Sequence, residues 1–518
     1  MRTPGTKQVR RAGAVILSAR LASHVALEAH SSGEIVTHFE GHSVGLGKFS
    51  ARTADRAQEL RAGLPLSPRA ATMDKELHLL IRRLAAHGLT EYRLGRPRNG
   101  EDLVVIEPQV SDYWPRIITI RDTDVLVLSR FAYLRRRGSE MVLESPRARA
   151  LFKICNPKIA AALAVLSTPQ KIRQLRRQDT IPEIELLALL VDCEILFKLK
   201  TDRDSGLRRT EGDNNLVLWD FHDLLFHTRS TEGRHANPLG GVYPYARTIS
   251  APPAVRPSWP GKKIPLRKFS ALQSETMSPF ARLLRQRHST RNFDDQRPIT
   301  LGELSRFLDG TAPILSELTT KLEFGEDSPS NTYAPRPYPS AGACYELELY
   351  LAVDKCEGLA RGFYHYEARE HVLVPIEVRS NQFEAVLMRA AFAMGAPAAP
   401  QILITIAARF ARISWKYSAI AYELILKDVG VLMQTFYLMA TDMGLGGCAI
   451  GIVNIDLFAK MTGIELHIEG PVGQFAIGRG IKLETPPPSI VASTARFVQT
   501  GKSEESRGAT GAKRTTAL

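Results

Sequence analysis

The sequence has no run of about 18 uncharged apolar residues, the length that a membrane-spanning helix needs. The basic start is followed by a short apolar run, but Ser18 and Arg20 interrupt that run and no clear cleavage site follows. We therefore expect neither a membrane partner nor secretion.

Cysteine is scarce as well, with five residues that are scattered along the chain and odd in number. None of them forms a CxxC pair or lies at a Cys/His spacing typical of a metal site. We expect reduced thiols in a cytoplasmic protein, and no structural metal.

Acidic residues are outnumbered by basic ones, which gives a formal net charge of +14. A cluster of this charge would favour nucleic acid, because Lys and Arg displace counterions from phosphates. Here the excess is spread along the chain, so we do not expect a nucleic-acid partner. Solvated surface charge, with some phosphate or peptide recognition, explains the balance better.

The length of 518 residues exceeds one ordinary core, and the composition is typical of a folded chain. A degenerate repeat, offset by about 106 positions, organises the first 200 residues. Each copy predicts a hairpin that turns at Gly33 or Gly138, followed by two helices and a short strand. Gly88 is placed to end the last helix of the first copy, and Pro182 to begin that of the second.

We therefore divide the chain into five parts: winged-helix-like modules at 1–105 and 106–205, a connector with a helix at 206–265, a main domain at 266–485 and a disordered tail at 486–518. The modules could add an extended peptide to a hairpin edge, bind DNA, or serve a structural role. In the connector, His222 and His227 with Asp220 and Asp223 could be imagined as metal ligands. Their i to i+5 spacing separates the two imidazoles on a helix, so we favour a packed helix.

Three motifs of the main domain indicate a cofactor site. The first is RQRHSTRNF, in which Arg287, Ser289 and Arg291 alternate after a helix. If the segment is extended, these side chains project to one side, where two guanidiniums and a hydroxyl would hold a phosphate. The alternative interpretation is an exposed basic segment.

The second motif is PYPSAGACYELELYL, residues 337–351. Small residues at 340–342 let the backbone approach a flat ring, and the following residues alternate as a strand. A hairpin, GFYHYEAREHVLVPI, comes next. An ordinary turn leading into a sheet is the alternative.

The third motif is GVLMQTFYLMATDMGLGG, a buried helix that stops at Gly444. The glycine turn is not the GxGxxG of a dinucleotide-binding unit, because no strand precedes it. We therefore exclude NAD binding by a Rossmann domain.

In this order, the motifs resemble the FMN-binding nitroreductase superfamily, and PYPSAGACYELELYL with GLARGFYHYEAREHVL resembles its SagB-type azoline dehydrogenases. Upstream segments such as LWDFHDLLFH extend the resemblance to roughly 125–480. It implies an α+β domain with an antiparallel-rich sheet flanked by helices, FMN as cofactor, and a homodimer with FMN at the subunit interface.

The resemblance implies cofactor contacts at each matching position. The residues that would hold FMN are Arg287, His288, Ser289, Arg291, Pro339, Ser340, Gly342, Gln434, Gly446, Gly447 and Arg479. Arg287, Ser289 and Arg291 would bind the phosphate and ribityl region, and Pro339, Ser340 and Gly342 would border the ring. Gly446 and Gly447 would face the ring from the other side.

The same resemblance implies that the adjacent pair Lys416 and Tyr417 is catalytic. Aromatising an azoline removes a proton and a hydride, and a lysine can take the proton if burial and nearby cations depress its pKa. Tyr417 could hydrogen-bond the heterocycle or relay the proton. Without the resemblance, a snorkelling lysine beside a packing tyrosine would be the simpler interpretation.

The leading hypothesis is thus an FMN-dependent dehydrogenase that oxidises peptide thiazolines or oxazolines to azoles, with a precursor peptide and a cyclodehydratase complex as partners. A generic NAD(P)H-dependent flavin reductase or nitroreductase is the first alternative. A non-catalytic scaffold that binds peptide or DNA is the second.

Overall fold

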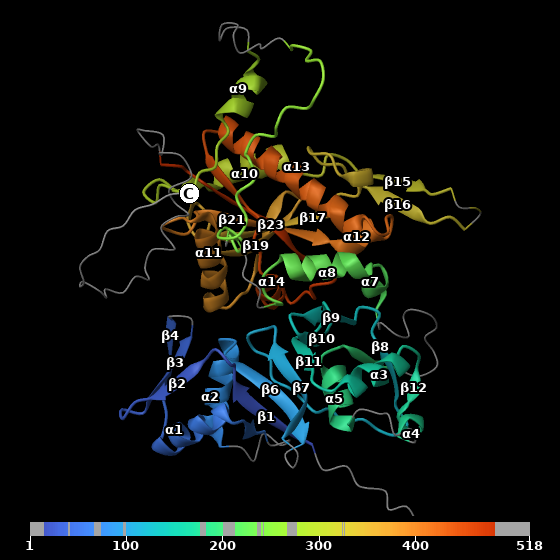
Figure 1. Cartoon of the computed structure of the whole chain (residues 1–518). Coiled ribbons are helices and arrows are strands. Elements are labelled where there is room, and N and C mark those ends of the chain that lie inside the picture. Colours follow the sequence, from blue (N-terminus) through green and yellow to red (C-terminus); the bar gives the residue numbers. More distant parts are fainter. Residues whose placement is uncertain are drawn as a thin grey trace, which may run out of the picture.

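The computed structural model describes residues 15–39, 42–66, 74–96, 100–176, 183–199, 213–235, 240–241, 243–266, 277–323, 325 and 327–481. Figure 1 shows an N-terminal lobe of the first 200 residues, a C-terminal lobe, and two connector helices between them. The expected tail from 486 and the proline at 182 lie outside the described residues.

A seven-stranded antiparallel sheet runs through the whole N-terminal lobe. In spatial order its strands are β5 (Leu64–Pro65), β1 (Ile16–Leu21), β6 (Thr90–Arg96), β7 (Glu101–Pro108), β11 (Ala150–Ile154), β10 (Glu140–Glu144) and β9 (Tyr133–Arg137). β7 pairs with β6 of the first half and β11 of the second, so the sheet crosses the position at which we divide the modules.

Each half of this lobe has a hairpin followed by helices and a strand, with two α-helices in the first half and three in the second. The first half has the hairpin strands β2 (Ala26–Ala29) and β3 (Glu34–Phe39), then β4 (His42–Lys48) and helices α1 (Ala51–Ala57) and α2 (Lys75–Ala86). The second has the β9–β10 hairpin, helices α3 (Pro157–Val165), α4 (Ile172–Leu175) and α5 (Ile184–Asp192), and a small sheet of β12 (Gln170–Lys171), β8 (Val125–Leu128) and β13 (Leu196–Lys198). Gly33 and Gly138 turn the two hairpins with φ of 81° and 60°.

The winged-helix description fits this lobe only in part. The first hairpin belongs to a separate sheet, β2-β3-β4, whereas the second is part of the seven-stranded sheet. Sequence periodicity gives the order of elements but does not reveal which strands pair across the repeat. The halves are therefore not clearly winged-helix modules.

The C-terminal lobe is built on a six-stranded antiparallel sheet. Its strands, in spatial order, are β20 (Val372–Ile376), β19 (Gly362–Glu367), β17 (Leu347–Val353), β21 (Ile402–Arg409), β23 (Glu469–Gly478) and β22 (Gly446–Ile450). Two small pairs flank it, β14 (Ile299–Thr300) with β18 (Cys356–Glu357), and β15 (Leu318–Lys321) with β16 (Ser330–Tyr333).

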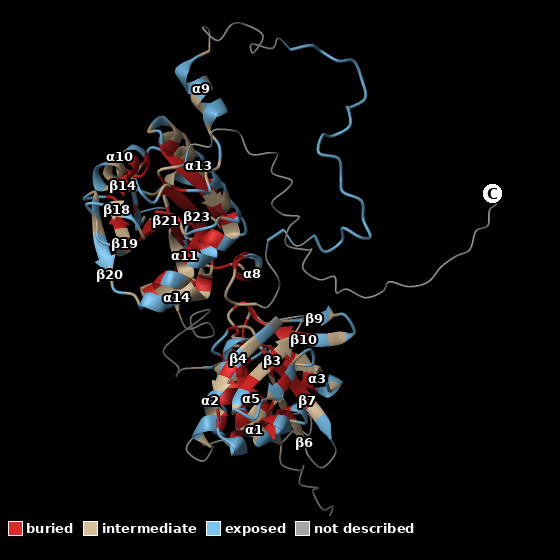
Figure 2. Cartoon of the chain, turned by 90° about the vertical axis from the view of Figure 1, so that its left-hand side faces the viewer, coloured by how far each residue is buried: buried red, intermediate tan, exposed pale blue. Residues whose placement is uncertain are grey.

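Both faces of the six-stranded sheet are buried. Leu347, Leu349 and Leu351 of β17 enter one core, as their alternation predicts, while Tyr350 and Ala352 enter the other. Helices α10 (Leu301–Thr311) and α13 (Ala421–Asp442) contribute to the first core, and α11 (Ser380–Met394) and α14 (Ile455–Thr462) to the second. Figure 2 shows buried residues concentrated within each lobe.

α13 is the one helix, among the described residues, that is long and apolar enough to cross a membrane. Within the lobe it packs on β22, β23 and α10, and one face of it, including Leu432 and Phe436, is fully buried. It ends at Asp442, just before Gly444 with φ of 69°. This long core helix carries residues of both halves of the candidate site.

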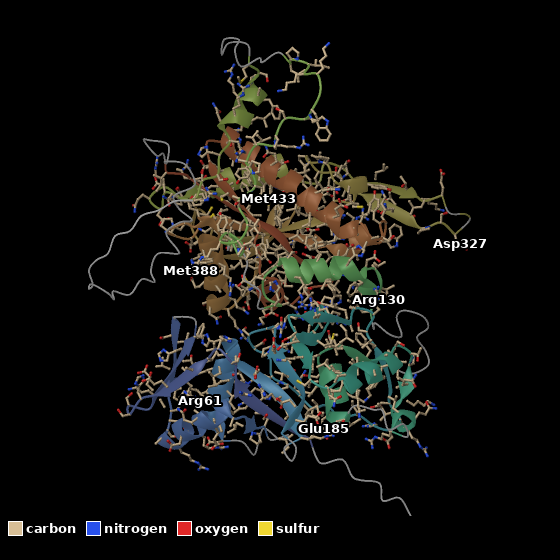
Figure 3. The ribbon with its side chains drawn as sticks, in the orientation of Figure 1. Arg61, Arg130, Glu185, Asp327, Met388 and Met433 are labelled. Atoms are coloured by element: carbon tan, nitrogen blue, oxygen red, sulfur yellow. The ribbon has the colours of Figure 1, made fainter. Side chains whose placement is uncertain are left out.

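The connector joins the two lobes through specific contacts. It forms two helices, α7 (Asn214–Val217) and α8 (Phe221–Ser230), where the sequence predicts one. Arg130 lies at the seam (Figure 3) and donates hydrogen bonds to the carbonyls of Leu216 and Trp219. The Trp219 indole donates in turn to the His467 carbonyl in the C-terminal lobe, at 2.8 Å. The described part of the connector thus forms two helices that contact both lobes.

Candidate functional site

The arginine motif begins where helix α9 (Pro279–Gln286) ends. The Arg287 guanidinium lies over the Tyr437 ring of α13, 4.9 Å from its centroid. The Ser289 hydroxyl shares a hydrogen bond of 2.7 Å with the Tyr437 hydroxyl, which also accepts a 2.9 Å bond from the Ala449 amide. The motif therefore faces α13 and the start of β22.

Arg291 belongs to the same cluster. Burial raises the pKa of the Cys448 thiol, and the positive charge of Arg291 opposes this effect. No carboxylate of the described residues forms an ion pair with Arg287 or Arg291. Two guanidiniums without an internal counterion, beside a hydroxyl, form a donor set that suits a phosphate.

The glycine turn lies directly beside this segment. The Thr290 amide donates a 2.8 Å hydrogen bond to the Gly447 carbonyl. A Cβ at Gly446 would lie 2.6 Å from the Thr290 methyl group, and one at Gly447 would lie 2.5 Å from the Phe475 ring. Both glycines are buried, so their small size serves the packing of residues 287–291 on β22.

For four further predicted FMN ligands, the surroundings do not indicate a cofactor contact. Arg479 pairs with both carboxylate oxygens of Glu303 at 2.7 Å, so its guanidinium is already engaged. The exposed His288 donates its Nδ1 proton to the Gln286 carbonyl. Gln434 and Pro339 are exposed on the surface of the lobe.

A buried carboxylate of α13 binds the turn that follows Pro339. Asp428 accepts hydrogen bonds from the Ser340 hydroxyl at 2.8 Å and from the Ala341 amide at 2.9 Å. Gly342 at the exposed tip has φ of 57°. Ala343 and Tyr345 are also left-handed, with φ of 55° and 48°. Such conformations cost roughly 1–3 kcal/mol each and persist where the surroundings fix them.

A second carboxylate, Glu346, is fully buried beneath the same turn. Burial, together with the negative charge of Asp428, raises the pKa of Glu346 to about 7. The Ser340 hydroxyl lies 3.4 Å from one oxygen of Glu346, and the other oxygen has no hydrogen-bond partner in the described structure. The folded protein therefore favours the protonated form of Glu346 beside the Asp428 carboxylate.

Lys416 and Tyr417 rest on the tip of this turn. They follow helix α12 (Phe410–Ser414), and the Lys416 amine donates a 2.9 Å hydrogen bond to the Gly342 carbonyl. A Cβ at Gly342 would overlap the Tyr417 hydroxyl and lie 2.6 Å from the Lys416 amine. Only glycine leaves room for this pair, so the structure brings three of the predicted residues into contact.

The surroundings of Lys416 differ from the expected buried environment. Its side chain is exposed, and its nearest rings are Tyr417 and Tyr333, with centroids 5.5 and 5.9 Å from the amine. Arg412 reinforces the turn instead, donating to the Cys344 carbonyl at 3.0 Å and to Asn331 at 2.9 Å.

Helix α13 contacts both parts of the site, the turn at residues 340–342 and the arginine segment at residues 287–291. Asp428, under the turn, and Tyr437, under the arginine segment, are nine residues apart on this helix. The separation is about 13–14 Å along the axis. Nine residues are two and a half turns, so the two side chains leave the helix on opposite sides, and the turn at residues 340–342 and the arginine segment pack on different faces of α13.

Sequence reasoning missed Asp428, Glu346, Arg412 and Tyr437. For Asp428 a signal exists, because it is an acidic residue on the buried stripe of an apolar helix. The other three depend on contacts between distant segments.

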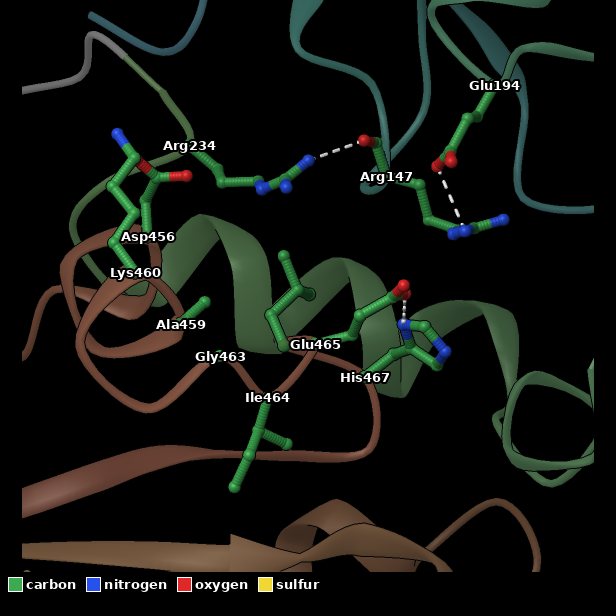
Figure 4. Close-up of a pocket in the computed structure, with 11 residues that line it drawn as sticks. Arg147, Glu194, Arg234, Asp456, Ala459, Lys460, Gly463, Ile464, Glu465 and His467 are labelled. Atoms are coloured by element: carbon green, nitrogen blue, oxygen red, sulfur yellow. Dashed lines mark hydrogen bonds and ion pairs between the residues drawn. The ribbon is translucent and has the colours of Figure 1, made fainter. Parts of the chain in front are cut away.

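The described residues also line three cavities away from this site. Figure 4 shows one of about 310 Å³ between the lobes, where Arg147 and Glu194 face Arg234 of the connector and Lys460 of α14. A second, of about 600 Å³, lies along α11, and a third, of about 580 Å³, between α8 and α13. No cluster of described His, Cys, Asp and Glu side chains suits a metal ion.

Comparison with known proteins identifies the family. Residues 284–479 match the model of the nitroreductase family, and residues 126–236 match that of the cyanobactin oxidase ThcOx. A putative nitroreductase of Methanocaldococcus jannaschii is 30% identical over 202 residues, which cover 39% of this chain and 90% of the relative. The chain belongs to the nitroreductase family. It is thus an oxidoreductase with an α+β, nitroreductase-like C-terminal domain, as the motifs predict.

Other relatives match less of their length or share less identity. The trifolitoxin-processing protein TfxB of Rhizobium leguminosarum bv. trifolii is 26% identical over 144 residues, or 27% of this chain and 39% of that protein. A putative nitroreductase structure from Ralstonia eutropha is 21% identical, covering 41% of this chain and 87% of its own, with a TM-score of 0.30. A chain of the E. coli microcin synthetase McbBCD complex with truncated pro-MccB17 bound is 17% identical, covering 54% and 99%, with a TM-score of 0.37.

Proposed function

We propose that this enzyme oxidises thiazolines or oxazolines of a precursor peptide to thiazoles or oxazoles, with FMN as cofactor. The observation that carries the proposal is the contact of Lys416 and Tyr417 with the exposed tip of the turn at Gly342. The match of residues 126–236 to the cyanobactin oxidase model supports the same chemistry.

The residues present fit FMN. Arg287, Ser289 and Arg291 would hold its phosphate end, since neither guanidinium forms an ion pair with a described carboxylate and both lie near the cluster of Ser289, Tyr437 and Cys448. The turn at Ser340–Gly342 would border its ring. When bound, FMN supplies a two-electron acceptor for a hydride.

The substrate loses one proton and one hydride for each ring that becomes aromatic. Lys416 is the proton acceptor in this proposal, because its amine is exposed toward the tip of the turn and held there by the Gly342 carbonyl. Tyr417 hydrogen-bonds the heterocycle or relays the proton. Oxygen would be the reoxidant of the bound FMN in this proposal.

We propose a homodimer for the working enzyme. Lys416 and Gly342 are exposed in the single chain, and a second subunit over them would exclude water. Further partners are a cyclodehydratase, which makes the azolines, and the precursor peptide. The solved microcin synthetase complex with a truncated precursor supplies a precedent for such an assembly in another protein. We place the reaction in the cytoplasm.

The test uses the full chain, purified with FMN supplied during expression. We expect a yellow protein that converts an azoline-containing peptide with a mass decrease of about 2 Da per ring. A generic reductase would instead consume NAD(P)H rapidly with a nitroaromatic acceptor. A flavin-loaded enzyme that does so and leaves azolines unchanged, or a protein that stays colourless, would overturn the proposal.

A further inference from the structure

The residue that follows the Lys416–Tyr417 pair by two positions is in a strained conformation. Ala419 has φ of 59°, in the left-handed region that alanine disfavours by roughly 1–2 kcal/mol. Its side chain is exposed, so burial of the methyl group does not explain the conformation. Something must hold the backbone of Ala419 in place.

Both backbone groups of Ala419 are bound by the start of the connector helix α8. The Asp220 carboxylate accepts a hydrogen bond from the Ala419 amide, and His222 lies 2.9 Å from the Ala419 carbonyl through Nε2. Because a carbonyl can only accept, Nε2 of His222 carries the proton in this contact. Asp220 and His222 flank Phe221, the first residue of α8.

Helix α8 also forms hydrogen bonds with the chain beyond Ala419. Asp223 accepts a hydrogen bond from the Tyr422 amide at 3.3 Å, and the buried His227 lies 3.0 Å from the Tyr422 hydroxyl. These contacts join residues that are nearly 200 positions apart. α8 therefore fixes the start of α13 as well as the loop before it.

On its other side, the backbone of the pair is held by the short helix α12. The amides of Lys416 and Tyr417 donate to the Ile413 carbonyl at 3.0 and 2.9 Å. Residues 418–420 are exposed, and the Ala419 contacts with α8 are their main links to the rest of the chain. Without α8, the loop would keep its anchor at α12 and lose the one at Ala419.

We infer that Asp220 and His222 are positioning residues that hold Lys416 and Tyr417 against the turn at Gly342. This inference rests on the proposed function, in which the pair contacts the substrate. It gives the segment that matches the cyanobactin oxidase model, residues 126–236, a part in catalysis by the segment that matches the nitroreductase model, residues 284–479. The two segments thus form one active unit.

The first test separates kcat from KM in the azoline assay. We expect Asp220→Ala and His222→Ala each to lower kcat about 10-fold, because small displacements of catalytic groups are costly, with KM for the peptide within about 2-fold. Asp220→Asn keeps an oxygen that accepts the Ala419 amide, so kcat should return to within about 3-fold of wild type. Glu423→Gln is the matched control, since Glu423 forms only an exposed pair with Lys427 on α13.

The second test reports on the contact itself and does not depend on turnover. Hydrogen–deuterium exchange of the peptide containing Ala419 should accelerate about 10-fold or more in Asp220→Ala and stay slow in Asp220→Asn. Native kcat in both alanine variants, an Asp220→Asn enzyme as slow as Asp220→Ala, or unchanged exchange would each overturn the inference. If Asp220→Ala fails to fold, His222→Ala decides alone. A wild-type protein that leaves azolines unchanged refutes the proposed function, while the exchange experiment still decides whether α8 holds the loop.

Discussion

The hydroxyls of Ser289 and Tyr437 are 2.7 Å apart, which ties the arginine segment to the long helix α13. Two turns and a half earlier, the same helix presents Asp428 to the amide of Ala341. Two and a half turns place these two contacts on opposite faces of α13, so one helix positions both loops without presenting them on a single side.

Lys416→Ala should abolish azole formation while leaving the flavin bound. Removing the proton acceptor lowers kcat by about 10²- to 10⁴-fold. Mass spectrometry of the peptide and flavin absorbance of the protein measure the two effects. Lys427→Ala, an exposed lysine of α13 that pairs with Glu423, is the control and should behave as wild type. A native rate in Lys416→Ala would show that another group takes the proton.

Gly342→Ala should disable the site even though it adds only a methyl group. The new Cβ would overlap the Tyr417 hydroxyl and lie 2.6 Å from the Lys416 amine, at a φ of 57° that alanine disfavours. We expect at least about 10-fold lower activity and a loss of about 1–3 kcal/mol in the free energy of unfolding. Gly430→Ala in α13, where no atom lies within 4 Å of the new Cβ, should instead leave stability equal or raise it by up to about 1 kcal/mol. Equal activity of the two variants would refute the packing argument.

Reversing the charge of Arg291 should weaken flavin binding. Losing a charge-assisted contact and adding a repulsive one raises the dissociation constant for FMN about 10- to 100-fold. Fluorescence titration of the apoprotein with FMN measures this change for Arg291→Glu. Arg285→Glu is the control, because Arg285 is exposed on α9, before the non-helical segment begins. Equal affinities in the two variants would exclude Arg291 from the phosphate site.

Glu346→Gln should flatten the pH dependence of stability. The pKa of Glu346 is raised to about 7, mainly by burial, from an ordinary value of 4.5. The folded state thus prefers the protonated carboxyl, whose stabilising contribution is complete below about pH 4.5 and is lost as the pH rises through about 7. Urea unfolding at about pH 5 and pH 8 should show a larger decline in wild type than in the variant, by about 1–3 kcal/mol. An equal decline in the free energy of unfolding in both proteins would show that the pKa of Glu346 is not raised in the folded state.

The parts of the site that the sequence predicts are local. The strand at Leu347–Val353, the hairpin after Gly362 and the helix that stops before Gly444 all follow from periodicity and glycine placement, and all are observed. The placement of Arg287 beside Tyr437, or of Ala419 beside Asp220, depends on tertiary contacts that no local pattern encodes.

Two expectations meet contacts that the local sequence does not reveal. Arg479, which the resemblance implies as an FMN ligand, pairs with Glu303, a residue that also caps α10 through its bond to the Thr300 amide. In the N-terminal lobe, the repeat suggests two separate modules, yet their strands share one sheet. In both cases the partner comes from a distant segment: Glu303 binds the Arg479 guanidinium, and β11 of the second half pairs with β7.

β7 is the middle strand of that seven-stranded sheet, with three strands on either side. Its hydrogen bonds to β6 and β11 join the two halves of the N-terminal lobe. A substitution that destabilises β7 would weaken the pairing of both halves, so we expect the N-terminal lobe to unfold in a single cooperative transition. Cleavage of the chain near residue 105 would leave two fragments, each with an unpaired strand edge that favours aggregation.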